Sequence, residues 1–178
     1  MYKYRRIDAT NFLRPRFNSG HRLVVYSLLF LLIYIGFTKF SERYRIVVDI
    51  TPHRCLNAWI YVLDTYDKTY QPGDIVTIAG AGVPLLPDKY RYTKMVGGVE
   101  GQKVSFDGLY VKNDAGFVHH APVRDIYYEL KKKRNLPSEW ELGKDKVFLM
   151  GDTIYSLDSR VVGLANATYI LWKAYVLF

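Results

Sequence analysis

The sequence holds a single cysteine, and its surroundings make it a candidate for chemistry. Cys55 lies in the segment TPHRCLNAW, with His53 and Arg54 directly before it. A lone thiol has no disulfide partner, so it is either a small buried apolar residue or a group kept for its reactivity. A reactive thiol needs a base within reach to act as a nucleophile. One cysteine also excludes a multi-cysteine zinc site.

Lys94 is the candidate base. It lies near the start of an apolar strand predicted over Tyr92–Val99, which runs into a glycine-rich turn. A lysine that faces an apolar wall loses hydration and can act as a neutral amine base. The other interpretation is a lysine in contact with solvent, and the residue type alone leaves both open.

The most specific segment of the sequence is GDTIYSLDSRVVG, residues 151–163. Asp158 and Arg160 bracket Ser159, a spacing that allows a charge-assisted contact to hold a turn. Ser156 and Ser159 add two hydroxyl groups. Taken alone, the segment is equally consistent with a polar hairpin.

Together, the order and spacing of these three segments resemble the type I signal peptidases, and among them the conjugative-transfer (TraF-like) branch. Residues 156–163 match the family's S-x-D-S-R-x-x-G motif in full. The family's lysine motif, K-x-V-x-G-x-P-G-D, matches at Lys94, Val96, Gly98 and Gly101. Gly73–Val76 is similar to the G-D-I-V strand that lies between the nucleophile and the lysine. The resemblance covers roughly residues 20–178.

The sequence departs from the family pattern at several positions. Cys55-Leu56-Asn57 stands where the family usually has a serine, in an S-M-x-P segment or, in the conjugative branch, an S-L-P-like segment, so the serine is replaced and the proline is missing. Thr153 replaces an asparagine. Glu100 and Gln102 replace the proline and aspartate of the lysine motif. The conjugative branch includes members with a C-L-P segment, which is compatible with a cysteine nucleophile. The alternative is an inactive protein of the same fold that binds a pilin precursor or a component of a conjugation or secretion channel.

The resemblance implies a Cys–Lys dyad in a signal-peptidase-like hydrolase. Cys55 would attack the scissile carbonyl of an exported precursor and Lys94 would take the thiol proton, with a backbone N–H of Cys55 donating to the oxyanion. Residues around the dyad would orient the amine, add an oxyanion donor or brace the site: Ser156, His53, Asp158, Arg160 and Asp152. The family implies no cofactor and no metal. It suggests a pilin precursor as substrate, and leaves hydrolysis and joining of the pilin's two ends both open.

Other kinds of site find less support in the sequence. An unrelated Cys/His enzyme would use His119 or His120, but adjacent histidines are more often surface residues. Metal binding through these histidines and Asp125 lacks a convincing ligand spacing. No nucleic-acid-binding motif accompanies the net charge of +8.

The elements that must position these residues are mostly strands. Runs rich in β-branched and aromatic residues predict strands over 45–50, 59–63, 75–79, 92–99, 103–106, 109–112 and 147–150, and one long or two short buried strands over 168–178. Asp107-Gly108 is a hairpin signal. Helical spacing of Val123, Ile126, Tyr127 and Leu130 predicts a helix over Pro122–Arg134. We therefore expect an antiparallel, mostly β, signal-peptidase-like domain with a small helical insertion near residues 113–145.

Charge and hydropathy near the N-terminus predict a membrane anchor. Residues 1–22 carry six basic side chains and one acidic one, and Leu23–Thr38 has no charge. No small-residue cleavage pattern follows, and the segment is apolar all round, so an uncleaved signal anchor is favoured over a cleaved signal peptide or a buried core helix. The positive-inside rule then predicts a cytoplasmic tail (1–22), a transmembrane helix (23–40) and a periplasmic domain (41–178) on a bacterial inner membrane. The expected partners are the lipid bilayer, the exported precursor and the conjugative transfer machinery.

Overall fold

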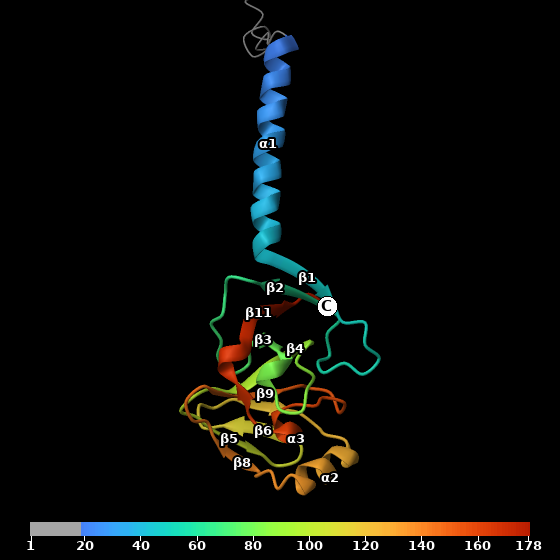
Figure 1. Cartoon of the computed structure of the whole chain (residues 1–178), viewed down its shortest axis with the longest axis vertical. Coiled ribbons are helices and arrows are strands. Elements are labelled where there is room, and N and C mark those ends of the chain that lie inside the picture. Colours follow the sequence, from blue (N-terminus) through green and yellow to red (C-terminus); the bar gives the residue numbers. More distant parts are fainter. Residues whose placement is uncertain (1–18) are drawn as a thin grey trace, which may run out of the picture. The chain divides into compact units, whose positions relative to one another are not determined.

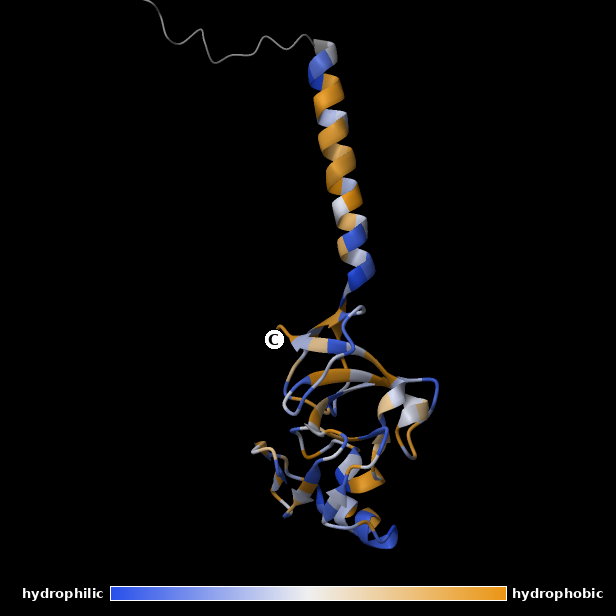
Figure 2. Cartoon of the chain, turned by 90° about the vertical axis from the view of Figure 1, so that its left-hand side faces the viewer, coloured by the Kyte–Doolittle hydropathy of each residue, from blue (hydrophilic) through white to orange (hydrophobic). Residues whose placement is uncertain are grey.

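The computed structural model describes residues 19–178, which divide into two units after Ser41. The described part of the first unit is helix α1 (Ser19–Arg43), whose last two residues belong to the second unit. Hydrophobic residues, orange in Figure 2, make up much of this helix, and its large apolar side chains are exposed. Within it, Gly20–Arg43 is long and apolar enough to cross a membrane, by length and composition alone. These 24 residues extend ~36 Å at 1.5 Å per residue, more than the ~30 Å hydrocarbon core. Most of the expected basic tail, residues 1–18, lies outside the described residues.

The second unit is built on a seven-stranded sheet in which every pair of neighbouring strands is antiparallel (Figure 1). In spatial order its strands are β1 (Tyr44–Val48), β2 (Ile60–Asp64), β11 (Ile170–Val176), β3 (Ile75–Ala79), β4 (Arg91–Gly98), β9 (Lys146–Met150) and β10 (Ala165–Asn166). The last long strand, β11, is thus inserted between β2 and β3. This order matters because the chain before β2 and the chain in β4 carry the two main candidate residues.

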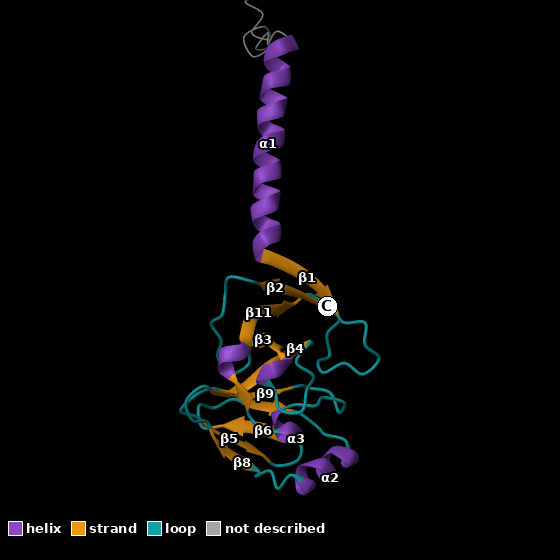
Figure 3. Cartoon of the chain, viewed as in Figure 1, coloured by secondary structure: helices purple, strands orange, loops and turns teal. Residues whose placement is uncertain are grey.

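A smaller sheet follows β4 in the chain. Its order is β7 (Val118–His120), β6 (Tyr110–Asn113), β5 (Lys103–Phe106) and β8 (Glu139–Glu141). Asp107-Gly108 makes the β5–β6 turn: Gly108 has φ +106°, and Asp107 Oδ1 accepts hydrogen bonds from the N–H groups of Leu109 and Tyr110. Between β7 and β8 the chain forms α2 (Asp125–Lys133), as Figure 3 shows. The remaining short helices are η2 (Gly80–Gly82), α3 (Ser159–Val162) and η3 (Ala167–Tyr169).

Three apolar clusters hold the second unit together, and one of them lies beside Cys55. Leu56, Ala58, Tyr61, Leu63 and Ala174 form this cluster from the segment before β2, from β2 itself and from β11. Leu56 is 2 % exposed. Burying a leucine side chain contributes about 1.5–3 kcal/mol, so the residue after Cys55 anchors the loop that carries the thiol.

The predicted architecture is confirmed: the protein has antiparallel sheets, small helices and an apolar N-terminal helix. Strands 75–79 and 103–106 form within the predicted bounds. The expectation that the C-terminal strand is buried is wrong at its end, where Tyr175 and Val176 are 45 % and 46 % exposed. The sequence does not predict β7, β8 and β10, because these strands are two or three residues long and too short for an alternating pattern.

Candidate active site

The structure brings Cys55 and Lys94 into direct contact. Lys94 Nζ lies 2.8 Å from Cys55 Sγ. Cys55 belongs to a loop between β1 and β2 that the Asp49–Trp59 backbone hydrogen bond closes, and its side chain is partly accessible. Lys94 is 1 % exposed and shares the inward face of β4 with Val96, because alternate residues of a strand point to the same side.

Two further contacts fix the orientation of the Lys94 amine. Its Nζ lies 2.9 Å from both Ser156 Oγ and the carbonyl oxygen of Leu157. The Ser156 hydroxyl donates to Asp158 Oδ2 at 2.5 Å, so its oxygen is left to accept from Lys94. A neutral amine has two N–H donors and one lone pair. With Ser156 and Leu157 occupying two directions of the amine, the third direction is left to Cys55 Sγ. In a neutral amine this third direction holds the lone pair that would accept a proton from the sulfur.

Asp158 and Arg160 form a fully buried ion pair behind Ser156. Arg160 Nε and Nη2 donate to the two Asp158 oxygens at 2.8 Å and 2.6 Å, and Nη2 also donates to the Gly151 carbonyl. Burial alone would raise the pKa of Asp158, but the charge and hydrogen bonds of Arg160, with Lys94 and Ser156, hold that pKa below its usual value. The carboxylate is therefore ionised at neutral pH and stays an acceptor for Ser156.

Asp152 and its neighbours hold the Cys55 loop in place. The Cys55 carbonyl accepts from the N–H groups of Asp152 at 3.1 Å and Thr153 at 3.4 Å. Asp152 Oδ1 in turn accepts from the N–H of Asn57 at 2.8 Å. A side chain at Gly151 would place its Cβ 2.1 Å from the Cys55 carbonyl oxygen, so only glycine permits this approach.

The predicted oxyanion donors lie at the mouth of the site. Within residues 19–178 the backbone N–H of Cys55 has no hydrogen-bond partner, so it is free to donate to a substrate carbonyl. The His53 ring packs at a tilt against the Tyr155 ring, with 4.5 Å between ring centroids, and borders the same cleft as Cys55. All seven predicted site residues thus lie around the Cys55 loop and the middle of β4.

Cys55 opens into a cleft of about 430 Å³. Val47, Val48 and Asp49 line one part of the cleft, and residues 90–93, which include the first three residues of β4, line another. Tyr61 also lines it; burial, followed by the charge of Asp49, raises the pKa of this phenol to about 12, so it stays protonated at neutral pH. The sequence analysis missed Tyr61 and the Leu157 carbonyl. A backbone carbonyl carries no residue-type signal, and Tyr61 is one of sixteen tyrosines.

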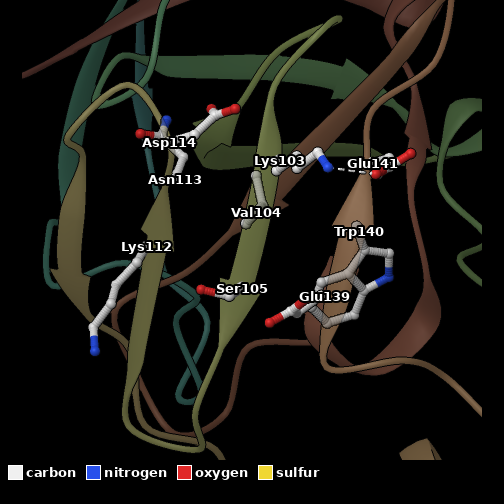
Figure 4. A pocket seen from close by; sticks show the side chains of 9 residues that line it. All are labelled: Lys103, Val104, Ser105, Lys112, Asn113, Asp114, Glu139, Trp140 and Glu141. Carbon is white, nitrogen blue, oxygen red and sulfur yellow. Dashed lines mark ion pairs between the residues drawn. The ribbon is translucent and has the colours of Figure 1, made fainter.

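A larger hollow, about 570 Å³, lies on the small sheet and holds none of the predicted site residues (Figure 4). It is lined by charged side chains of both signs, including the Lys103–Glu141 pair at 2.8 Å. On β7, His119 stacks on Phe117 and His120 packs at a tilt against Tyr110, and neither histidine lines the Cys55 cleft. Among the described residues there is no group of three histidine, cysteine or carboxylate side chains placed to hold a metal ion.

Comparison with known proteins points to one family. The sequence profile described as "Signal peptidase, peptidase S26" matches residues 19–178. A crystal structure of a signal peptidase I from Enterococcus faecalis is similar at 18 % identity and a TM-score of 0.39, covering 62 % of this chain and 97 % of the other. No curated protein matches the chain.

Proposed function

The chain belongs to the signal peptidase family, peptidase S26, and from this premise we propose that it cleaves an exported precursor with Cys55 as nucleophile and Lys94 as general base. The observation that carries the proposal is the 2.8 Å contact between Lys94 Nζ and Cys55 Sγ, with the two other directions of the amine occupied by Ser156 and Leu157. A surface lysine would have no such fixed partners.

The proposed reaction has two steps. In the first, Lys94 takes the thiol proton, Cys55 Sγ bonds to the scissile carbonyl carbon, and the backbone N–H of Cys55 donates to the developing oxyanion. The C–N bond breaks and the leaving amine takes the proton back from Lys94. In the second step Lys94 removes a proton from water, whose oxygen attacks the thioester, and the proton returns to the sulfur as the acid leaves.

The edge of β4 is the proposed site for the acyl part of the substrate. β3 pairs with β4 along Arg91–Met95, whereas β9 joins β4 only from Met95 onward. In the sheets that residues 19–178 form, the other edge of Arg91–Lys94 is therefore unpaired beside the cleft. An extended peptide can add to such an edge, with its side chains alternating into the cleft and out of it.

We further propose that the protein is a single-pass inner-membrane protein of the conjugative-transfer branch. Residues 1–22 would lie in the cytoplasm, 23–40 in the membrane and 41–178 in the periplasm. The residues that match the branch make a pilin precursor the first substrate to test. A thioester is attacked readily by amines as well as water, so both cleavage and acyl transfer to the pilin's own amino terminus are outcomes to look for.

The test is to co-express the full chain with its pilin precursor and follow the precursor's mass. Wild type should process it; Cys55→Ala and Lys94→Met should each lose at least ~100-fold in rate, the usual contribution of a nucleophile or general base. Cys55→Ser should retain partial activity. Lys68→Met, an exposed lysine between β2 and β3, is the matched control and should behave as wild type.

Two outcomes would contradict the proposal. Equal processing by wild type, Cys55→Ala and Lys94→Met would show that the dyad does not act. A precursor left intact by wild type, but recovered in a complex with it, would favour the inactive binding protein instead.

A further inference from the structure

A second hollow lies on the other side of the Cys55 loop from the cleft. It measures about 340 Å³ and is lined by residues of the loop and of the segment after β9, with Pro122. Cys55 lines the cleft, whereas its neighbours Arg54 and Leu56 line this hollow. His53 lines the cleft and Tyr155 lines the hollow, and their two rings are in contact, with 4.5 Å between the centroids. The loop and the ring pair thus form a partition with a binding space on each side.

The two spaces suit different parts of one peptide. The cleft runs along the unpaired edge of β4, so it suits the extended chain that is to be acylated onto Cys55. A peptide whose carbonyl reaches Cys55 from that side must continue past the partition, and the hollow is the space it meets there. A volume of 340 Å³ is at the small end of ligand pockets, enough for two or three small residues.

One charged group in the hollow is placed to recognise an amine. The backbone N–H of Asp152 donates to the carbonyl of Cys55 itself, which holds Asp152 beside the loop, and its Oδ1 accepts from the N–H of Asn57. Among the described residues, its Oδ2 accepts no hydrogen bond. The nearest basic residue of the lining, Arg54, stacks on Trp59 with 3.5 Å from Cζ to the ring centroid, and no described contact joins it to Asp152.

We propose that this hollow binds the residues that follow the scissile bond, and that Asp152 holds the amino group that cleavage creates. The proposal rests on the proposed function, because it assigns the leaving-group side of the same reaction. When the C–N bond breaks, the nitrogen leaves as a neutral amine carrying the proton returned by Lys94. It then takes a second proton from water, since an α-amino group is mostly charged at pH 7, and the resulting ammonium pairs with the free Asp152 oxygen.

The proposal can be tested by binding, without turnover. The probe is the peptide Ala-Ala-Gly-Lys(fluorescein)-amide, which represents only the leaving side, and its Nα-acetylated form is the matched uncharged probe. Fluorescence polarisation is measured on the full chain in a neutral detergent at pH 7. We expect the free-amine peptide to bind about 10-fold more tightly than the acetylated one, as a charge-assisted hydrogen bond predicts.

Two variants separate recognition of the amine from support of the loop. Asp152→Asn keeps an oxygen for the Asn57 N–H but loses the charge, so it should abolish the 10-fold preference and leave the acetylated probe unchanged. Ile154→Lys adds a positive charge to the same hollow at a side chain that is 39 % exposed, and should weaken only the free-amine probe, with Ile154→Gln as its uncharged control. Asp114→Asn, an exposed carboxylate on the small sheet, should change neither affinity.

Equal binding of the two probes to wild type, or equal weakening of both by Asp152→Asn, would overturn the proposal. Because no bond is broken in this assay, it can succeed where the precursor-processing experiment fails. A preference for the free-amine peptide without processing of the precursor would support the amine site and contradict the proposed function. Processing without such a preference would support the proposed function and contradict the amine site.

Discussion

Ser156 and Leu157 occupy two directions of the Lys94 amine and leave the third to the Cys55 thiol. Ser156 accepts from the amine because the Ser156 hydroxyl is committed to Asp158, and Asp158 is kept ionised by Arg160. The proposed Cys55–Lys94 dyad therefore depends on a chain of three buried residues behind it, Ser156, Asp158 and Arg160. Changes in that chain should affect catalysis and stability together, whereas changes in the Cys55 loop should mainly affect catalysis.

Gly151→Ala should abolish processing. The added methyl group would lie 2.1 Å from the Cys55 carbonyl oxygen and 2.4 Å from Ser156 Oγ, so the nucleophile loop, the lysine partner or both must move. We expect the rate of precursor cleavage to fall at least ~100-fold, since a displacement of about 1 Å is enough for such a loss. Gly143→Ala, where a methyl group would meet nothing within 4 Å, is the control. Normal activity of Gly151→Ala would show that the loop tolerates displacement.

Asp158→Asn should destabilise the domain by about 3–5 kcal/mol at pH 7, because it leaves the buried Arg160 charge without its partner. The pKa of Asp158 is lowered in the folded state, so its contribution is fully present above the unfolded carboxyl value near 3.9 and disappears as pH falls through the folded value. The difference between wild type and variant in the free energy of unfolding, measured with urea, should therefore be constant from pH 7 to 5 and become smaller below about pH 4. Asp114→Asn, which removes an exposed carboxylate, is the control for the effect of the substitution itself. A stability difference for Asp158→Asn that does not change with pH would contradict the lowered pKa of Asp158.

At the scale of elements, β11 joins the two halves of the site. The Cys55 loop leads into β2, and Lys94 lies on β4, which β3 separates from β11. β11 pairs with both β2 and β3, so the thiol and the amine are brought together by the last strand of the chain. The backbone carbonyl of Phe178 adds to this by accepting from the N–H groups of Trp59 and Ile60.

Removal of residues 170–178 should therefore abolish processing and the cooperative unfolding transition of the domain. The truncated sheet would expose the paired edges of β2 and β3 and lose the packing of Ala174 beside Leu56. Removal of Phe178 alone should cost far less, on the order of 1 kcal/mol for two hydrogen bonds at the edge. Circular dichroism and thermal unfolding measure both. An intact transition in the long truncation would show that the two halves associate without β11.

Strands with a clear residue pattern were predictable from the sequence, whereas the geometry of the site was predictable only in part. β3 and β5 stand out because β-branched and aromatic residues fill short runs between turn residues, and Asp107-Gly108 marks its hairpin. The insertion of β11 between β2 and β3 leaves no local signal, because it is set by pairing between residues about 100 positions apart. The same holds for Lys94, whose burial depends on Ser156 and Leu157. On α2, Ile126 fits the helical spacing yet is 65 % exposed, since no described element covers that side.

At the scale of the whole molecule, α1 connects directly to the domain that carries the site: it ends at Arg43 and β1 begins at Tyr44. Arg43 also pairs with Asp64 on β2 at 2.7 Å, so the last residue of the helix is tied to the first two strands. If α1 crosses the membrane, the start of the sheet is confined to the membrane surface.

Membrane attachment should depend on the centre of α1. Replacing both Leu29 and Ile33 by arginine places two charges in the middle of the apolar stretch, each costing about 2.5–3.5 kcal/mol for insertion. The variant should leave the carbonate-resistant membrane fraction, while wild type and the surface variant Lys68→Met should remain in it. A periplasmic reporter fused after Phe178 should be active in wild type. An inactive reporter on a stable fusion would reverse the proposed orientation.

The accessible thiol at the mouth of the cleft has a practical consequence. Because Cys55 is the sole cysteine of the sequence and is only partly buried, a maleimide or an alkylating reagent has one place to react. Labelling stoichiometry by mass spectrometry then counts functional sites directly, with no need to know the natural substrate. The same property allows reactive peptides to be screened for cleft occupancy by competition, so that the preferred acyl sequence can be found before any precursor is identified.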